Sequence, residues 1–131
     1  MRCDTDKISY THAVNGIEPL GPYSQATAHG EIIFTSGQLG LNPENNELEA
    51  DIERQTIRAL NNLKSVLEQS GSDVDHVLKT TVYLTDMVHF PTVNKIYGRF
   101  FIGAKPARTT LQVAALPNNA LIEIECIATK K

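Results

Sequence analysis

The chain has 131 residues, of which 41% are hydrophobic and 21% charged, and this length and composition fit one water-soluble domain over residues 1–131. No stretch is apolar enough to cross a bilayer, which excludes an integral membrane protein. The formal net charge of −3 comes from mixed charges without a long run of either sign, which argues against nucleic acid as a partner.

The cysteines and the first residues indicate the compartment. Cys3 and Cys126 are the only cysteines and form no CxxC pair, so a reducing environment is expected. The opening "MRCDTDKISYTHAV" has neither the apolar core of a secretory signal nor the Arg- and Ser-rich, acid-poor composition of a transit peptide. We therefore expect a cytoplasmic protein without a membrane partner.

The first predicted elements are strands. The residues from Ile8 to Val14 are a weak candidate for a short edge strand. The segment "SQATAHGEIIFTSGQL" has a turn at His29-Gly30 between two extended segments rich in strand-forming residues. This pattern predicts a β-hairpin.

Two helices and a strand are predicted in the middle of the chain. A helix runs from about Asp51 to Ser70, because apolar residues recur there at three- and four-residue spacing. Asp51 can cap its start, and Gly71 can end it in the left-handed conformation. A strand follows in "HVLKTTVYLTD", where β-branched and aromatic residues gather. The second helix lies in "FPTVNKIYGRFF", with Pro91 in its first turn.

Two final strands are predicted at about Thr109–Ala115 and Leu121–Thr129, on either side of the loop "LPNNA". The element order is therefore strands, helix, strand, helix, strands. This order predicts an α/β (α+β) fold, a single two-layer domain with a mixed β-sheet and both helices on one face.

One face of the predicted sheet has no helix to cover it. Side chains alternate along the last strand, and one set is apolar and suits the helices: Ile122, Ile124, Cys126 and Ala128. The set on the other face mixes apolar residues with two carboxylates: Leu121, Glu123, Glu125 and Ile127. Self-association would supply the missing layer.

Arg108 precedes the first of the two final strands and shares a face there with Thr110 and Gln112. If "LPNNA" is a simple hairpin loop, Glu123 lies opposite Val113, about 16 Å along the strand from Arg108. The two residues then could not easily share a small ligand within one subunit. We expect a site that uses both to form between two subunits of a homo-oligomer.

Each candidate motif also has a purely structural interpretation. "GPYS" has ordinary turn chemistry, and the glycines of "TSGQLG" can form a bulge or let the backbone approach a ligand. Asn94 can be a solvated residue of the second helix. Arg108 can form an ion pair with Glu123 or Glu125, or its planar guanidinium can bind a carboxylate or phosphate.

Motifs for metals and common cofactors are absent from the sequence. The four histidines have no spacing typical of a metal site, and neither cysteine joins them. There is no phosphate-binding glycine loop, nucleophile elbow or Rossmann fingerprint. We therefore expect neither a metal nor a cofactor.

Five segments together resemble the reactive intermediate/imine deaminase family, RidA, in matching order over nearly the whole chain: "GPYSQA", "FTSGQLGLNP", "VYLTDM", "VNKIYGRFF" and "PARTTLQVAALPNNALIEIECIA". The resemblance implies a chorismate-mutase-like fold and a homotrimer with active sites in the clefts between subunits. It also implies hydrolysis of 2-iminobutanoate and 2-iminopropanoate to 2-oxo acids and ammonia. These imines are products of pyridoxal-phosphate-dependent dehydratases, so the reaction belongs to metabolite damage control.

The resemblance further assigns roles to individual residues. It implies a substrate pocket that includes Tyr23, Ser36, Gly37, Asn94 and Thr110. Arg108 would hold the substrate carboxylate, and Glu123 would position the attacking water. Thr110 stands where several bacterial members have cysteine, so a mechanism that needs a thiol is not expected here. The backbone N–H at this position could still donate a hydrogen bond.

Two other functions fit the same residues. A trimer that binds small carboxylates without catalysis, as a sensor or holdase, would use the same arginine. A ribonuclease or translation inhibitor is attached to some relatives, but the acidic balance and the lack of an aromatic and basic strip weigh against it. The decay of an imine generated in situ distinguishes the enzyme from the binding protein.

Overall fold

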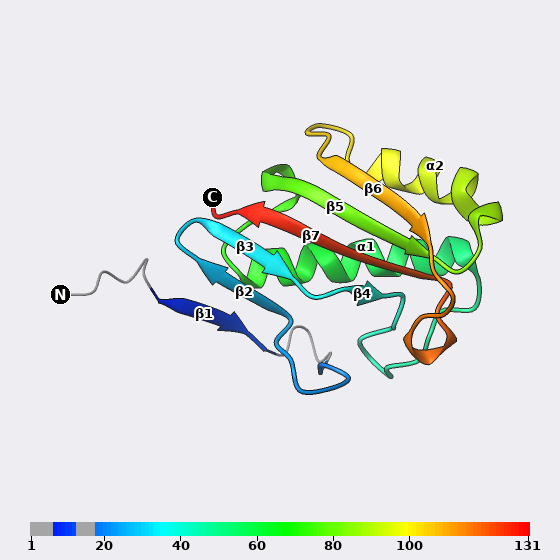
Figure 1. Ribbon diagram of the computed structural model, residues 1–131, viewed down its shortest axis with the longest axis horizontal. Coiled ribbons are helices and arrows are strands. Elements are labelled where there is room, and N and C mark those ends of the chain that lie inside the picture. The colour runs from blue at the N-terminus through cyan, green and yellow to red at the C-terminus, as the bar shows by residue number, and fades with distance from the viewer. Residues whose placement is uncertain (1–6, 13–17) are drawn as a thin grey trace.

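Three antiparallel strands begin the sheet in the computed structural model, which describes residues 7–12 and 18–131 (Figure 1). β1 (Ile8–Thr11) pairs with β2 (Ala26–His29), and β2 pairs with β3 (Ile32–Thr35). Gly30 has a φ of 60° in the turn between β2 and β3. Glycine adopts this conformation without strain, and the predicted hairpin is confirmed. Residues 13 and 14 of the expected first strand, and Cys3, lie outside the described residues.

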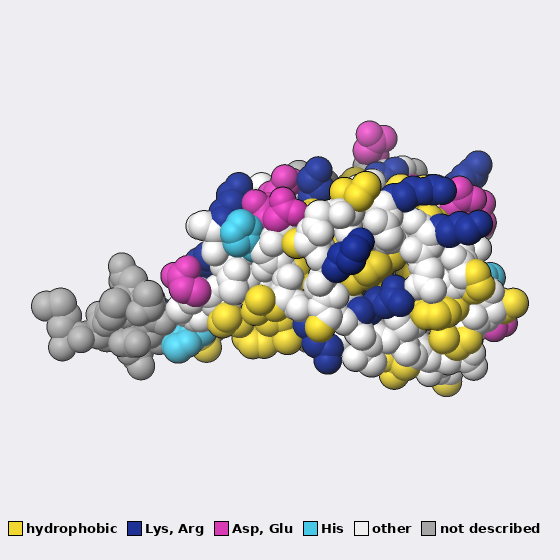
Figure 2. Space-filling model, turned by 90° about the horizontal axis from the view of Figure 1, so that it is seen from above, with side chains coloured by type: hydrophobic (Ala, Val, Ile, Leu, Met, Phe, Trp, Pro, Cys, Tyr) yellow, Lys and Arg dark blue, Asp and Glu magenta, His cyan; other side chains and the backbone are white. Residues whose placement is uncertain are grey.

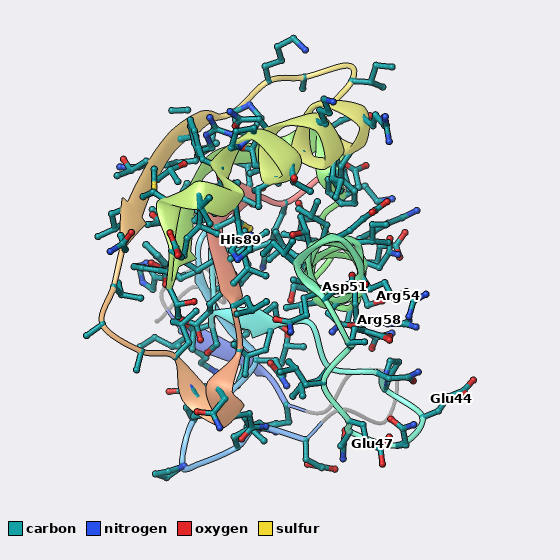
Figure 3. All side chains as sticks on the ribbon, turned by 90° about the vertical axis from the view of Figure 1, so that its right-hand side faces the viewer. Glu44, Glu47, Asp51, Arg54, Arg58 and His89 are labelled. Carbon is teal, nitrogen blue, oxygen red and sulfur yellow. The ribbon has the colours of Figure 1, made fainter. Side chains whose placement is uncertain are left out.

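The two helices form where the apolar spacing predicts them. α1 (Ile52–Gln69) begins after Asp51, whose Oδ1 accepts a hydrogen bond from the Arg54 N–H at 2.8 Å, and Gly71 follows its end with a φ of 83°. α2 (Phe90–Phe100) carries Pro91 in its first turn. Figure 3 shows both helices on the same side of the sheet, with Asp51 at the start of α1.

The remaining strands are β4 (Gln38–Leu39), β5 (Val77–Leu84), β6 (Ala107–Gln112) and β7 (Ile122–Thr129). Short 3₁₀ helices, at Val74–His76, Met87–His89 and Pro117–Asn119, lie in the connections. The strand order is β1-β2-β3-β7-β5-β6, with β4 paired to β7 beside β3. β6 runs parallel to β5, and the other pairings are antiparallel.

This order excludes the simple hairpin loop that was one possibility for "LPNNA". β6 and β7 do not pair with each other but lie on opposite sides of β5, so Glu123 is opposite Tyr83 instead of Val113. Asn118 and Asn119 both have positive φ in the connection, which directs the chain away from β6. Asparagine is one of the few residues that tolerates this conformation.

The predicted division of β7 into two faces is confirmed. Ile122, Ile124, Cys126 and Ala128 are buried and belong to the core between the sheet and the helices, whereas the alternate residues are partly exposed. Phe34 on β3 is 49% exposed and is paired with Ile127, so an apolar surface continues across the sheet face opposite the helices. Among the described residues, no helix has both the length and the apolarity to span a membrane.

Candidate functional site

A cavity of about 230 Å³ contains three of the residues that the sequence singled out, Tyr23, Gly37 and Glu123. It lies where the chain leaves β3 and continues into β4. The rest of its lining comes from residues that the sequence did not point to: Glu18, Leu20, Gln25, Gln38, Leu39, Leu41, Asn62 and Pro117. The volume suits a ligand of a few non-hydrogen atoms.

Gly37 allows the Glu123 side chain to lie directly against the backbone. A Cβ at position 37 would be 2.5 Å from Glu123 Cδ and 2.8 Å from its Oε2, distances that no real side chain shows. Gly37 does not have a positive φ. The glycine is therefore needed for close approach, which is one of the two interpretations open for "TSGQLG".

The neighbouring Ser36 holds the loop that carries Tyr23 in place. Its hydroxyl donates a hydrogen bond to the Ser24 carbonyl at 2.6 Å, which ties the "GPYS" loop to the end of β3. Ser36 does not belong to the cavity lining. The Tyr23 hydroxyl accepts a hydrogen bond from the Leu20 N–H at 3.0 Å, so this loop also holds its own tyrosine beside the cavity.

Two buried amides fix the strand that borders the cavity. The Asn62 side chain, on α1, donates to the carbonyls of Leu39 and Leu41 at 3.0 and 2.9 Å. Gln38 Nε2 donates to Gln25 Oε1 at 2.9 Å. One signal in the sequence could have revealed Asn62, because it is a polar residue beside the apolar stripe of the first helix.

The surroundings of Glu123 favour the protonated form of its carboxyl group more than bulk water would. Burial raises the pKa of this carboxyl above its ordinary value of 4.5, and the nearby charge of Glu125 adds to the effect. Glu125 accepts a hydrogen bond from the Tyr83 hydroxyl at 2.6 Å, a contact that raises the pKa of Tyr83 to about 12. A carboxylate with raised proton affinity is a better base toward water than an exposed one.

A second group of predicted residues lies on the edge strand β6 and on α2. The Arg108 guanidinium carbon is 4.7 Å from the centroid of the Tyr97 ring and 5.5 Å from that of Phe90. Arg108 is opposite Thr80, whose hydroxyl shares a hydrogen bond with the Tyr97 hydroxyl. Arg108 therefore projects from the sheet face that carries the helices. Figure 2 is seen from above the β6 and α2 edge of the sheet, and basic side chains lie among hydrophobic ones there.

The ion-pair interpretation of Arg108 is not supported by its surroundings. Within the described part of the chain, no carboxylate oxygen lies within 4 Å of this guanidinium. Glu125 is engaged by Tyr83 on the opposite face of the sheet. The aromatic contacts leave the donors of Arg108 available for an anion.

Asn94 and Thr110 belong to the same two elements as Arg108 and its aromatic contacts, and each has a buried oxygen without a hydrogen-bond partner among the described residues. Asn94 is on the same face of α2 as Phe90 and Tyr97, at helical spacing, and Thr110 is two residues beyond Arg108 on β6. Over residues 7–12 and 18–131, only Asn94 Oδ1 and Thr110 Oγ1 are buried side-chain oxygens or nitrogens without a hydrogen-bond partner. The interpretation of Asn94 as a simply solvated residue is therefore wrong.

The two groups do not meet in one chain. Arg108 on β6 faces the helices, Glu123 on β7 faces away from them, and β5 lies between the two strands. The sequence separated Arg108 and Glu123 by the register of a simple hairpin, whereas the structure places them on opposite faces of the sheet. The predicted residues thus form two separate groups in one chain, which we call the cavity half-site (Tyr23, Gly37, Glu123) and the arginine half-site (Asn94, Arg108, Thr110).

Comparison with known proteins gives matches over most of the chain. The model of the family described as Endoribonuclease L-PSP matches residues 13–130. Reactive Intermediate Deaminase A, chloroplastic, from Arabidopsis thaliana is 51% identical over 84% of this chain and 59% of its own length, so the chain spans somewhat over half of that protein. The 2-iminobutanoate/2-iminopropanoate deaminase of Mus musculus is 46% identical over 85% of this chain and 83% of its own.

Solved structures agree with these matches. The E. coli protein TdcF, crystallised with bound serine, superposes with a TM-score of 0.88 at 34% identity and covers 94% of this chain and all of its own. The mixed sheet, the two helices on one face and this similarity define a protein of the chorismate-mutase-like α+β class. Within that class, the chain belongs to the RidA family, whose model carries the Endoribonuclease L-PSP description.

Proposed function

We propose that this protein hydrolyses 2-imino acids such as 2-iminobutanoate and 2-iminopropanoate to 2-oxo acids and ammonia. The observation that carries the proposal is an arginine with aromatic contacts but no acidic partner within the described residues. A small substrate with a carboxylate fits such a group. The printed names of the Arabidopsis and mouse relatives support this reaction, and TdcF with bound serine supports recognition of a small amino-acid-like carboxylate.

Substrate binding begins at the arginine half-site. Arg108 pairs with the two carboxylate oxygens through its planar guanidinium, the geometry that a bidentate pair requires. The Thr110 hydroxyl and the Asn94 amide oxygen are buried without a partner among the described residues, and a small side-chain rotation would allow each to form a hydrogen bond to the bound molecule. The carboxylate is thereby fixed, and the imine carbon extends toward the cavity half-site of a neighbouring subunit.

The chemical step uses Glu123 and a water molecule. The protonated imine carbon is already electrophilic, so orientation and proton transfer are the main requirements. Glu123 takes a proton from water as the water oxygen bonds to the imine carbon and the C=N π pair moves to nitrogen. The carboxyl then protonates the nitrogen of this carbinolamine. The C–N bond breaks with its electron pair on ammonia, and the hydroxyl oxygen forms the carbonyl and releases its proton.

We also propose a homotrimer in which each site forms between two subunits. Its support is the separation of the half-sites in one chain, together with the partly apolar sheet face that no helix of residues 7–12 and 18–131 covers. Light scattering at micromolar concentration should give three times the chain mass of 14.4 kDa. A monomer would contradict the proposal.

Subunit mixing tests where the site forms. Arg108→Ala and Glu123→Gln chains should each be inactive alone, but a trimer assembled from both contains some clefts with an intact arginine and an intact glutamate. Random assembly of equal amounts should restore about a quarter of the wild-type rate, because each half-site is intact in half of the subunits. If mixed trimers form and no activity returns, the site does not lie between subunits.

The reaction itself is tested by the decay of an imine generated from threonine by a dehydratase. The protein should accelerate this decay above the spontaneous rate and release ammonia in equal amount with 2-oxobutanoate. Small-carboxylate binding without turnover, the second candidate, would leave the decay rate unchanged while 2-oxobutanoate still binds in calorimetry. RNA cleavage that disappears on further purification would remove the ribonuclease alternative.

The cytoplasmic location expected from the sequence remains a prediction. The name of the Arabidopsis relative assigns that protein to the chloroplast, so members of the family occupy more than one compartment. Fractionation of the source cells, with detection by an antibody to this chain, would test the location.

A further inference from the structure

The Arg108 guanidinium is bordered by two aromatic rings that have different surroundings. Phe90 is at the first position of α2 and is partly exposed, whereas Tyr97 is 8% exposed and belongs to the main core. The Tyr97 ring is also the nearer of the two, at 4.7 Å from the guanidinium carbon compared with 5.5 Å for Phe90. Tyr97 is thus a core residue with one side against the proposed carboxylate-binding group.

A hydrogen bond anchors this ring. The Tyr97 hydroxyl and the Thr80 hydroxyl are 2.7 Å apart, and Thr80 is completely buried at the centre of β5. Thr80 is also directly opposite Arg108 in the parallel β5–β6 pairing. One residue therefore sets both the backbone position of the arginine and the position of the ring that its guanidinium contacts.

The contact with the Tyr97 ring restricts the flexible Arg108 side chain before any ligand binds. An arginine has four rotatable bonds, and a ligand that must first order them binds more weakly than one that meets an ordered guanidinium. Burial raises the pKa of the Tyr97 hydroxyl, and the Thr80 bond and the Arg108 charge only partly oppose this effect, so the ring stays a neutral phenol. A neutral ring attracts the guanidinium through its π face and leaves the N–H donors available.

We infer that Tyr97, held by Thr80, is a positioning residue that orders the Arg108 guanidinium for the substrate carboxylate. This inference rests on the proposed function of Arg108 as a carboxylate clamp. This positioning requires the aromatic ring of Tyr97, whereas the Tyr97 hydroxyl contributes only by forming the hydrogen bond to Thr80 that holds the ring. It predicts that loss of the ring impairs carboxylate binding without direct damage to the chemical step.

The test compares four variants by calorimetric titration with 2-oxobutanoate and by steady-state kinetics. Tyr97→Leu removes the ring, and binding should weaken about three- to thirty-fold, the range expected for a lost cation–π contact. KM should rise by a similar factor and kcat should change less. Tyr97→Phe and Thr80→Val each keep the ring but break its anchor, so smaller effects are expected. The double variant Tyr97→Phe/Thr80→Val leaves no buried hydroxyl without a partner, so it should be closer to the wild type in stability than either single variant.

Phe100→Leu is the matched control, because Phe100 is an aromatic residue of the same helix that packs against Phe101 and the core. It should lower the thermal midpoint without changing carboxylate affinity. If Tyr97→Leu is folded and binds 2-oxobutanoate as tightly as the wild type while Arg108→Ala does not bind, the positioning role is wrong. If Arg108→Ala also binds normally, the clamp itself is wrong, and the proposed function fails with it.

Discussion

Substitution of Gly37 by alanine tests the contact between the backbone and the Glu123 carboxyl group. The new Cβ would lie 2.5 Å from Glu123 Cδ, where two carbon atoms need about 3.5 Å or more. The carboxyl group must therefore move by about 1 Å, and a misplacement of that size at a reacting centre lowers a rate by about 100-fold. This loss equals about 2.7 kcal/mol of transition-state stabilisation.

Stability should respond much less than activity to this change. Gly37 does not have a positive φ, so alanine can adopt its backbone conformation, and the colliding atoms belong to a side chain that can rotate away. The free energy of unfolding should change by less than about 1 kcal/mol, since alanine also reduces the entropy of the unfolded chain. Imine decay in the dehydratase-coupled assay, with circular dichroism on the same preparation, measures both effects.

Gly40→Ala is the contrasting variant. A Cβ there would lie 2.5 Å from the Gln55 Cα and 2.6 Å from its carbonyl oxygen, which belong to the backbone of α1 and cannot rotate away. This variant should lose about 1–3 kcal/mol of stability through overpacking. The reasoning about Gly37 would be refuted if folded Gly37→Ala had the wild-type rate.

The other predictions concern three side chains of the half-sites. Arg108→Lys should raise KM for 2-iminobutanoate by about 10- to 100-fold in a folded protein, because an ammonium cannot form the bidentate pair; an unchanged KM would show that no such pair forms. Glu123 has a raised pKa in the folded chain, so it binds its proton more tightly there than in the unfolded chain. As pH rises above 4.5 through the raised pKa, the wild type should lose stability relative to Glu123→Gln. Urea denaturation from pH 4 to 8 measures this difference, and parallel curves would contradict it. Asn94→Asp should place a carboxylate near Arg108, and it should raise KM more than it changes kcat. Asn94→Ala should alter the free energy of unfolding by less than about 1 kcal/mol. Equal effects of the two variants on KM would exclude a competing ion pair between the new carboxylate and Arg108.

Local signals in the sequence were enough to predict the helices and the first hairpin. Asp51 and Gly71 limit α1 because a cap and a left-handed residue act on neighbouring backbone groups alone. Gly30 acts in the same way in the hairpin. The two faces of β7 also follow from alternation, which requires no knowledge of the neighbouring strands.

The neighbours of each strand could not be predicted in this way. β7 pairs with β3, β4 and β5, which are far from it in sequence, and a pattern along β7 does not specify which strand lies beside it. The sequence therefore could not decide whether "LPNNA" is a simple hairpin loop, and the structure shows that it is not. The contact between Tyr97 and Arg108 could not be predicted either, because it exists only after β6 has paired in parallel with β5.

The roles of the site residues also depend on contacts between segments that are far apart in the sequence. Gly37 and Glu123 meet because β4 and β7 are paired, and the role of the Ser36 hydroxyl depends on the position of the Ser24 carbonyl. The resemblance to a family supplied these candidates, and the structure adds the hydrogen bond between Ser36 and Ser24, which the resemblance did not imply. The unpartnered oxygens of Asn94 and Thr110 became apparent only in three dimensions.

The central position of β7 has a consequence for biosynthesis. Residues 122–129 are the last strand of the sheet to be made, yet they join the hairpin sheet of β1–β3 to the β5–β6 pair. Until they emerge from the ribosome, β3 and β5 each have an edge with unpaired backbone groups, the kind of edge that pairs with other chains. Stable folding must therefore wait until this strand has been released, and nascent chains stalled before residue 122 should depend on chaperones to stay unaggregated.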